Sequence, residues 1–514
     1  MAEFNLKSIK GVCSLTLFSI FTTISAEDKR PNILIFFADD MGWQDTSLPF
    51  HTDTTFLNKR YHTPNMEVLA QMGTKFTQAY ASSVSSPSRC SLLTGVNAAR
   101  HCVTNWTHIK NSFTDDPHIS LEMPHWNVNG IQPVEGIDHS FPATSFVQVL
   151  SQNGYKTIHC GKAHFGATET PGADPLNYGF DINIAGHAAG GLASYLGTER
   201  FGHNEKGDPI SRFAVPGLQE YWDKDIFITE ALTQEAIKAL DKVISKEKPF
   251  LLYMSHYAVH VPLQADKRFV DKYLQQGLSE NEAAYASMLE GVDKSLGDLM
   301  HYLNDKGELE NTIILFISDN GGYSLHGRTP PLNMQNSPLR AGKGSAYEGG
   351  IRVPMILYWR ERTKPGSTVK DYVIIEDIFP SILEMAQIKR YKTLQSIDGK
   401  SFVPKLRKDA SKHFRRSLIW NMPNNWISGM NRESGIGPTC TIRRGDYKLI
   451  YWYEDGKKEL YNLKTDIGED KNLVGLLNYK TKKMSKKLSK KLRKSNAQRP
   501  FYKATNKPCL WPDE

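Results

Sequence analysis

The chain has 514 residues, of which 40% are hydrophobic and 23% are charged, and its formal net charge is +8. This is the balance of a globular protein with enough apolar side chains for a large core. Its length suggests two to four domains, or one large α/β domain with a smaller companion. Five cysteines remain once Cys13 in the N-terminal segment is set aside. They allow one or two bridges at most, which excludes a disulfide scaffold.

The positive charge is concentrated in one segment, residues 480–494, with the sequence KTKKMSKKLSKKLRK. It holds nine Lys and Arg and no acid, and subtracting those nine leaves about −1 for the rest of the chain. The net charge therefore does not indicate a nucleic-acid-binding protein. Met484, Leu488 and Leu492 recur every four residues, which predicts an amphipathic helix with a packed stripe and a basic face in solvent. Contact of that face with an acidic polymer is the alternative.

The N-terminal segment has the layout of a secretory signal peptide. Lys7 and Lys10 precede a mostly apolar run of 16, residues 11–26, which ends in Ala26 and is followed by EDKR. The run is shorter and richer in Ser and Thr than a membrane anchor, and no other segment is long and apolar enough to span a bilayer. We expect residues 1–26 to be removed and the protein to be exported, to the periplasm or alternatively to the cell surface or medium.

The next part of the chain alternates between buried strands and amphipathic helices. Apolar runs predict strands at 32–37, 157–160, 249–255 and 312–317, and apolar spacing of three and four predicts helices at 225–245 and 280–304. This alternation favours an α/β fold with a mostly parallel sheet flanked by helices. From about residue 414 short strands and turns follow, including a hairpin around residues 454–456. We expect a catalytic domain at 27–405 and a smaller antiparallel subdomain with the basic helix at 406–514.

Polar side chains follow four of these predicted strands. Because ligands bind outside the carboxyl ends of strands in open α/β sheets, we expect them to meet at one edge, although each pair alone is also typical of turns, caps or packed residues. They are Asp39 and Asp40; Lys162 and His164; His256 and His260; and Asp319 and Asn320.

The residue types at this edge suit a metal and an anion. Carboxylate and amide oxygens are the ligands of hard cations, whereas zinc recruits histidine or cysteine, so we expect Ca²⁺ in an exported protein, with Mg²⁺ as the alternative. Lysines and histidines, joined by Arg89 and Lys343, would surround the metal with positive charge. This combination favours a phosphate or sulfate ester as the substrate.

One string, SSPSRCSLLTG at residues 85–95, first reads as a helix start, with Ser85 or Ser86 as the cap and Pro87 in the first turn. It also resembles the signature of the type I sulfatases, a branch of the alkaline phosphatase superfamily. Further segments carry the same resemblance, which covers nearly the whole mature chain: PNILIFFADDMGW, GKAHFG, HVP at His260, SDNGG, and GKGSAYEGGIRVP at 342–354.

The resemblance implies a modified nucleophile. Ser85 would be oxidised to formylglycine by a maturase that reads the SxPSR motif, and the serine form implies a maturase of the anaerobic radical type. A serine that attacked sulfur directly would leave a stable sulfate ester, whereas a hydrated aldehyde can attack with one hydroxyl and expel sulfate through the other.

The resemblance also implies roles for the other residues. Calcium would be bound by Asp39, Asp40, Asp319, Asn320 and the modified Ser85. Arg89 would orient the diol, Lys162 and Lys343 would hold sulfate oxygens, His260 would be the general acid, and His164 would assist at the diol or sulfate. Two positions depart from the commoner pattern: Val259 stands where proline is usual before the catalytic histidine, and Ala163 stands where GKWHLG has tryptophan.

The function expected from these observations is hydrolysis of sulfate esters on polysaccharides or oligosaccharides. Algal polysaccharides, glycosaminoglycans and mucin glycans all remain open as substrates. A phosphoesterase or phosphonate esterase, and a non-catalytic glycan-binding protein in which Ser85 stays a serine, are the alternatives. Residues that would suit sugar binding, each also explained by packing, are Trp106, Trp126, His187, Trp420, Asn424, Asn425 and Trp426.

Overall fold

The computed structural model describes residues 30–514 except 245–247, 326–327, 329–333, 407–415 and 431. The predicted signal peptide and its cleavage site lie outside the described residues, so export stays a prediction. Among the helices of the described part, none combines the length and the apolar character needed to cross a membrane.

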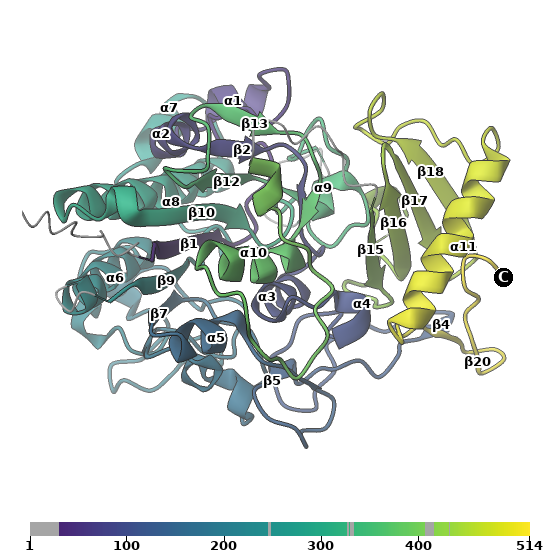
Figure 1. The fold of residues 1–514 in the computed structure, drawn as a ribbon, viewed down its shortest axis with the longest axis horizontal. Coiled ribbons are helices and arrows are strands. Elements are labelled where there is room, and N and C mark those ends of the chain that lie inside the picture. The colour runs from purple at the N-terminus through teal and green to yellow at the C-terminus, as the bar shows by residue number, and fades with distance from the viewer. Residues whose placement is uncertain (1–29, 245–247, 326–327, 329–333, 407–415, 431) are drawn as a thin grey trace, which may run out of the picture.

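The centre of the molecule is an eight-stranded sheet in the order β13-β2-β12-β10-β1-β9-β7-β8 (Figure 1). Its strands are β1 (Asn32–Ala38), β2 (Thr74–Phe76), β7 (Lys156–Gly161), β8 (Ile182–Ile184), β9 (Phe250–Ser255), β10 (Thr312–Ser318), β12 (Met355–Tyr358) and β13 (Ser367–Val369). The five strands from β10 to β8 pair in parallel, and β12 is antiparallel to both of its neighbours. The prediction of a mostly parallel sheet is therefore confirmed.

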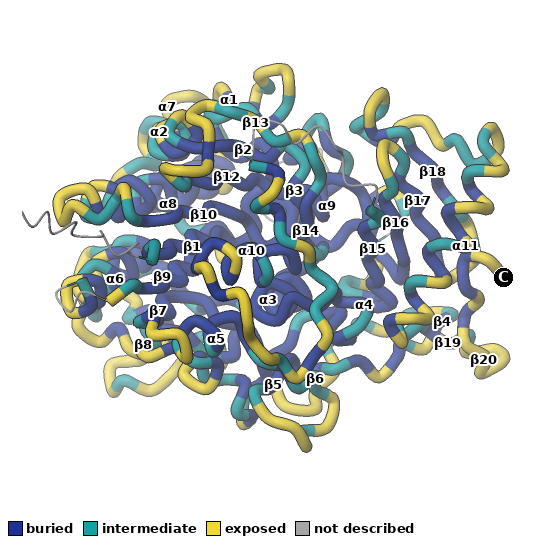
Figure 2. The backbone as a smooth tube through the Cα atoms, in the orientation of Figure 1, coloured by how far each residue is buried: buried dark blue, intermediate teal, exposed yellow. Residues whose placement is uncertain are grey.

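Helices cover both faces of this sheet, which explains why its central strands are apolar throughout. On β1, Leu34 and Phe36 pack into the core on one face, while Ile33, Ile35 and Phe37 pack into the core on the other. The helices on the first face are α2 (Pro64–Met72), α6 (Ile228–Ile244), α7 (Val270–Gln275) and α8 (Glu280–Asp305), and those on the second are α3 (Ser85–Thr94), α5 (Phe146–Gln152) and α10 (Ile378–Met385). The buried strands form the dark interior of Figure 2.

A second, antiparallel sheet forms the C-terminal part of the chain (Figure 1). It has the order β15-β16-β17-β18, with β15 at Ser417–Met422, β16 at Thr439–Arg444, β17 at Tyr447–Trp452 and β18 at Lys458–Asn462. The predicted hairpin is the β17–β18 pair. Helix α11 (Asn478–Lys494) packs on one face of the sheet through Met484, Leu488 and Leu492, as the four-residue spacing predicted. The exact boundary at 405/406 stays a prediction.

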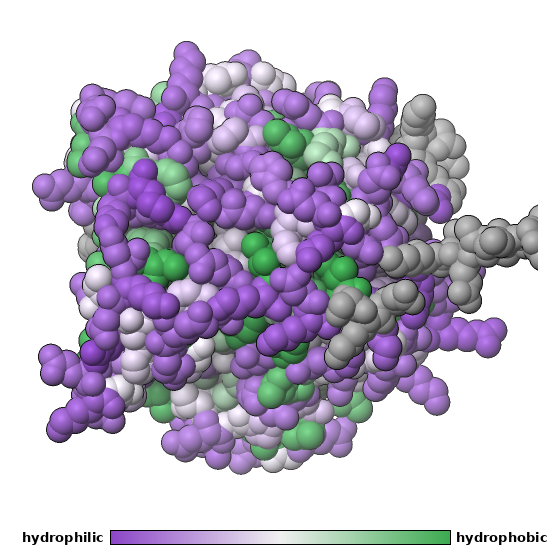
Figure 3. All heavy atoms as spheres, turned by 90° about the vertical axis from the view of Figure 1, so that its left-hand side faces the viewer, coloured by the Kyte–Doolittle hydropathy of each residue, from purple (hydrophilic) through white to green (hydrophobic). Residues whose placement is uncertain are grey.

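The other face of the C-terminal sheet packs against the large domain. Ile450 and Trp452 contact Ala341 and Tyr347, and Trp420 packs with Tyr80. By contrast, the end of the molecule far from this sheet shows apolar side chains scattered among polar ones (Figure 3). All five cysteines of the described chain are buried and free, so no disulfide joins the two sheets.

A buried ion-pair network links the C-terminal sheet to α9 (Glu348–Ile351) of the large domain and gives a stability prediction. Lys448 Nζ on β17 lies 3.1 Å from a carboxylate oxygen of Glu348 and 2.8 Å from one of Glu469, with all three side chains inaccessible to solvent. Replacing Lys448 by methionine leaves the buried Glu469 without a paired cation and leaves Glu348 with Arg352 alone, at 3.4 Å. We therefore expect a loss of about 3–5 kcal/mol in the free energy of unfolding, measured by urea denaturation. The exposed Lys457→Met is the control and should change it by less than about 0.5 kcal/mol. Equal stability of the two variants would contradict this account.

Candidate active site

The acidic side chains come from two neighbouring parallel strands. Strands β1 and β10 pair in register up to Ala38 and Ser318, so the residues that follow them, Asp39 with Asp40 and Asp319 with Asn320, emerge side by side. All four are buried, and carboxylate oxygens of the three aspartates lie within 4.8 Å of one another. The predicted meeting of these residues at the carboxyl edge of the sheet is therefore observed. Among the described residues, this cluster is a place that could hold a metal ion.

Helix α3 directs Ser85 at this cluster. The helix begins at Ser85 itself, its N-cap is Val84, and no side chain caps it. The expectation that Ser85 or Ser86 caps the helix is therefore wrong. Ser85 Oγ instead lies 3.3 Å from Asp39 Oδ1 and 3.2 Å from Asn320 Oδ1, and it accepts a hydrogen bond of 3.3 Å from Lys162 Nζ.

Three cations balance the three carboxylates. Arg89 donates from Nε to Asp319 at 3.0 Å, Lys162 donates to Asp39, and Lys343 donates to Asp40 at 2.8 Å. Burial and the neighbouring Asp319 charge raise the pKa of Asp39 to about 8. Burial also disfavours the Asp40 carboxylate, but Lys343 and His260 outweigh it and lower the pKa of Asp40. Such crowding of buried acids is relieved by a divalent cation.

The histidines divide between the site and the core. His260 Nε2 lies 3.9 Å from Asp40 Oδ2, its Nδ1 lies 2.8 Å from the Val261 carbonyl, and its side chain is 20% exposed at the rim of the cluster. His164 lies beside the cluster, but its Nε2 contacts Ser86 Oγ and the Thr107 carbonyl, each at 2.8 Å, and not Ser85. His256 points away from the cluster, since its Nε2 contacts Ser295 on α8.

Two glycines that the sequence did not single out shape this side of the site. A Cβ atom at Gly190 would lie 2.2 Å from His164 Cε1, and one at Gly191 would lie 3.1 Å from His260 Cε1. Larger residues would displace the His164 ring and press on the His260 ring. The paired Gly-Gly in the sequence was the only signal, and Gly-Gly pairs are usually turns.

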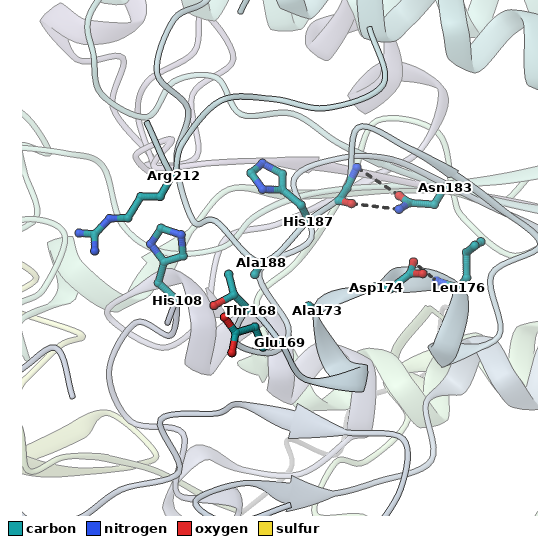
Figure 4. A pocket seen from close by; sticks show the side chains of 11 residues that line it. His108, Thr168, Glu169, Ala173, Asp174, Leu176, Asn183, His187, Ala188 and Arg212 are labelled. Carbon is teal, nitrogen blue, oxygen red and sulfur yellow. Dashed lines mark hydrogen bonds between the residues drawn. The ribbon is translucent and has the colours of Figure 1, made fainter. Parts of the chain in front are cut away.

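A cavity of about 460 Å³ lies next to the site (Figure 4). The segment 186–191 connects the two, because its first residues line the cavity and its last two pack against His164 and His260. His108 and His187 lie close together in the cavity wall, and neither ring nitrogen of the buried His108 has a hydrogen-bond partner. The lining residues are His108, Thr168, Glu169, Ala173, Asp174, Leu176, Asn183, Gly186, His187, Ala188 and Arg212.

The side chains predicted to suit sugar binding mostly have structural partners. Trp126 donates to Asp115 at 2.6 Å and Trp420 to the Ala81 carbonyl at 2.8 Å, and both are buried. Asn424 and Asn425 bind Asp115 and the backbone of residues 116–117. His187 lines the cavity, and the half-buried Trp426 ring lies 5.9 Å from Lys343 Nζ. For these two and for the half-buried Trp106, sugar contact stays a prediction.

Fold and site together define an α/β protein whose buried acids, lysines and serine suit a metal ion and an anionic ester. The family model described as "Sulfatase" matches residues 31–388, and that described as "N-sulphoglucosamine sulphohydrolase, C-terminal" matches residues 342–498. The first covers well over half of the chain. The chain therefore belongs to the sulfatase family, and it is a sulfuric ester hydrolase.

Individual relatives agree with this assignment. A "Sulfatase" of Formosa agariphila is 29% identical over 518 residues, covering 92% of this chain and 90% of that protein. The N-acetylgalactosamine-6-sulfatase of Mus musculus is 26% identical over 482 residues, covering 90% and 80%. The crystal structure of Ps i-CgsB in complex with k-i-k-neocarrahexaose superimposes with a TM-score of 0.69 at 26% identity, covering 90% of this chain and 93% of that one.

Proposed function

We propose that this protein is an exported sulfatase that hydrolyses sulfate esters on saccharides, with Ser85 oxidised to formylglycine as its nucleophile. The observation that carries the proposal is the position of Ser85 Oγ, which lies against Asp39, Asn320 and Lys162 at the buried acidic cluster. The saccharide is supported by the carrageenan-type oligosaccharide bound in the similar structure and by the galactosamine sulfatase among the relatives.

The residues present fit a calcium ion. Asp39, Asp40, Asp319, Asn320 and the modified Ser85 would hold it, because they offer only oxygen donors and Ca²⁺ or Mg²⁺ prefers such a set. Burial, together with the neighbouring Asp319 carboxylate, raises the pKa of Asp39 to about 8 although two lysines and an arginine balance the three acids in number, so a further cation would stabilise the ionised form of Asp39. A bound divalent cation supplies positive charge that stabilises the sulfate oxygens and the nucleophile.

With Ser85 oxidised, the hydrate of formylglycine would supply one hydroxyl to attack sulfur and a second hydroxyl through which sulfate would leave, with return of the aldehyde. The other residues of this chain position and stabilise. Lys162 pairs with Asp39, and Lys343 pairs with Asp40. Both ammonium groups can transfer a hydrogen bond from these carboxylates to sulfate oxygens. Arg89 is fixed by Asp319 and Ser255, and its guanidinium lies 3.9 Å from the Asp39 carboxylate that Ser85 contacts. His260 stands at the rim, and we assign it the protonation of the departing sugar oxygen. Burial and Lys343 lower the pKa of His260 to about 3, and a sulfate group bound between Lys343 and Lys162 would raise it by neutralising these cations.

The cavity of Figure 4 is the place we propose for the sugar ring. Its volume lies in the range of small-ligand sites, and the unpartnered His108 nitrogens offer hydrogen bonds to hydroxyl groups. His164 contacts Ser86, next to the nucleophile. It would then help to separate the nucleophile from the sugar, in addition to its predicted role at the diol or sulfate.

The experiment that tests the proposal begins with the mass of the peptide that contains Ser85, from protein produced with an anaerobic radical maturase. We expect a loss of about two mass units, the two hydrogens removed when the alcohol becomes an aldehyde. The same protein should release sulfate from a panel of sulfated oligosaccharides. An unmodified serine together with phosphate-ester hydrolysis would instead favour a phosphoesterase.

A further inference from the structure

A second cavity, of about 330 Å³, lies where the C-terminal subdomain meets the large domain. Its walls come from α4 (Ala98–His101) and the residue before it, from residues near 376 and 398–400, from the start of β15, and from α11. Its charged lining residues are Arg100, Glu376, Asp398, Lys400, Arg416, Lys487, Lys491 and Lys494. We call this the junction cleft. It holds six cations and two acids.

The acids of the junction cleft do not neutralise its lysines. Asp398 is bound by Arg100 through two hydrogen bonds of 2.9 Å, and Arg416 is paired with Asp377 behind the cleft wall. Glu376 accepts a hydrogen bond from Asn97 and pairs with no cation of the described chain. Lys400, Lys487, Lys491 and Lys494 each lack an acidic partner within 4 Å among the described residues. Counted against the unpaired Glu376, they leave an excess of three positive charges in the cleft.

The lysines of α11 in the cleft differ from those elsewhere on that helix. Lys487 and Lys491 are one turn apart and partly buried, whereas Lys486 and Lys490 on the same helix are exposed. Burial and neighbouring cations lower the pKa of both Lys487 and Lys491, and for Lys491 they outweigh the opposing effect of Asp398. A lysine is ordinarily drawn out of solvent only when it is paired, because desolvating an unpaired charge is unfavourable. An anion in the cleft would stabilise these two neighbouring half-buried lysines, which lack an acidic partner of their own among the described residues.

We propose that the junction cleft is a second anion-binding site that holds sulfate groups of a sulfated saccharide chain away from the active site. The inference rests on the proposed function for the identity of the saccharide. The cavity is within the size range of organic-ligand sites, and with its four unpaired lysines it can take more than one sulfate group at a time. It lies past the C-terminal end of α3, and the ten residues of that helix, at about 1.5 Å each, separate it from Ser85. All ten residues of α3 are buried, so a saccharide chain that occupies both sites must pass around this helix, over a straight-line separation of about 15 Å.

The test measures binding of sulfated hexasaccharides, from carrageenan, chondroitin sulfate and heparin, to full-length Ser85→Ala protein in about 50 mM salt, where screening is modest. The double variant Lys487→Gln/Lys491→Gln should weaken binding of the preferred hexasaccharide by about tenfold or more. Lys486→Gln/Lys490→Gln, with the same charge change on the exposed side of the same helix, should weaken it by less than about twofold. Thermal unfolding of each variant checks that the fold is kept.

A second experiment distinguishes an effect at the junction cleft from an effect at the active site. In matured protein with Ser85 intact, the cleft variant should keep the wild-type kcat/KM for 4-nitrophenyl sulfate and raise KM only for the hexasaccharide. Equal losses in the two double variants would overturn the junction cleft as a site, even if sulfate release is normal. Inorganic sulfate that binds the cleft as tightly as the hexasaccharide would overturn the saccharide as its ligand. Loss of all sulfate release in the wild-type protein would contradict the proposed function and leave the binding comparison intact.

Discussion

Replacing Ser85 by alanine abolishes sulfate release, with an expected fall in kcat/KM of about 10⁶-fold, the size of loss that removing a covalent nucleophile produces. Alanine has no hydroxyl for a maturase to oxidise, so neither hydroxyl of the aldehyde hydrate can form. Arg89, Lys162 and Lys343 remain, so the variant should still bind sulfated saccharides. The measurement is sulfate release from the best oligosaccharide of the panel, with wild-type and variant proteins matured side by side.

The structure indicates that this loss is chemical and not a failure to fold. Ser85 opens α3 but its side chain does not cap the helix, and alanine has the best intrinsic helix propensity. Ser91→Ala is the matched control, because Ser91 is a buried serine of the same helix whose hydroxyl contacts His101 and not the acidic cluster. It should keep activity within about threefold, since the cost of one lost buried hydrogen bond falls on stability.

Ser85→Cys gives a further check on the mechanism. The resemblance to type I sulfatases implies that a cysteine at this position is also oxidised to formylglycine, by an oxygen-using maturase. Ser85→Cys made with that maturase should therefore recover sulfate release, whereas Ser85→Ala should not recover it with either maturase. Undiminished activity in Ser85→Ala would contradict a nucleophile at this position.

The sequence predicted the sheet and the acidic cluster well, for a physical reason. Central parallel strands are buried on both faces, so β1, β9 and β10 stand out as apolar runs that end in polar residues. The position of Asp39, Asp40, Asp319 and Asn320 then followed from the rule that such ends meet at one edge of the sheet. Roles for Lys162, Lys343 and His260 came from the resemblance, and the structure places these side chains against the same aspartates.

What the sequence did not predict depends on side-chain direction and on contacts between distant segments. His164 and His256 each follow a strand end, yet one turns toward Ser86 and the other toward α8. The serine cap on α3 looked plausible locally, but the hydroxyl finds better partners in the cluster. The junction cleft joins segments near residues 97, 376, 398, 416 and 490, and helical periodicity alone could not tell a lysine in that cleft from one in solvent.

Replacing His260 by alanine should lower kcat/KM for a sulfated oligosaccharide by about 10²–10⁴-fold, the usual contribution of a general acid. A sugar alkoxide is a poor leaving group and needs a proton as the bond to sulfur breaks. Nitrophenolate is stable without one, so the same variant should lose less than about tenfold on 4-nitrophenyl sulfate. The ratio of the two losses is the measurement, because a general defect in sulfate binding or maturation would lower both rates equally.

The backbone around His260 has contacts of its own, so we expect His260→Ala to remove the imidazole ring without displacing the loop. The Val259 amide donates to the Asp39 carbonyl at 2.7 Å, and the Tyr195 hydroxyl donates to the His260 carbonyl at 2.7 Å, so the loop is fixed without the imidazole. His256→Asn is the control, since His256 lies on the same connection but contacts Ser295 in the core, and it should leave the ratio between the two substrates unchanged. Equal losses on both substrates in His260→Ala would contradict a role for His260 in protonation of the leaving oxygen and would indicate a defect in sulfate binding or in maturation. A selective loss would identify the rim of the cluster, between Asp40 and solvent, as the side from which the sugar oxygen departs.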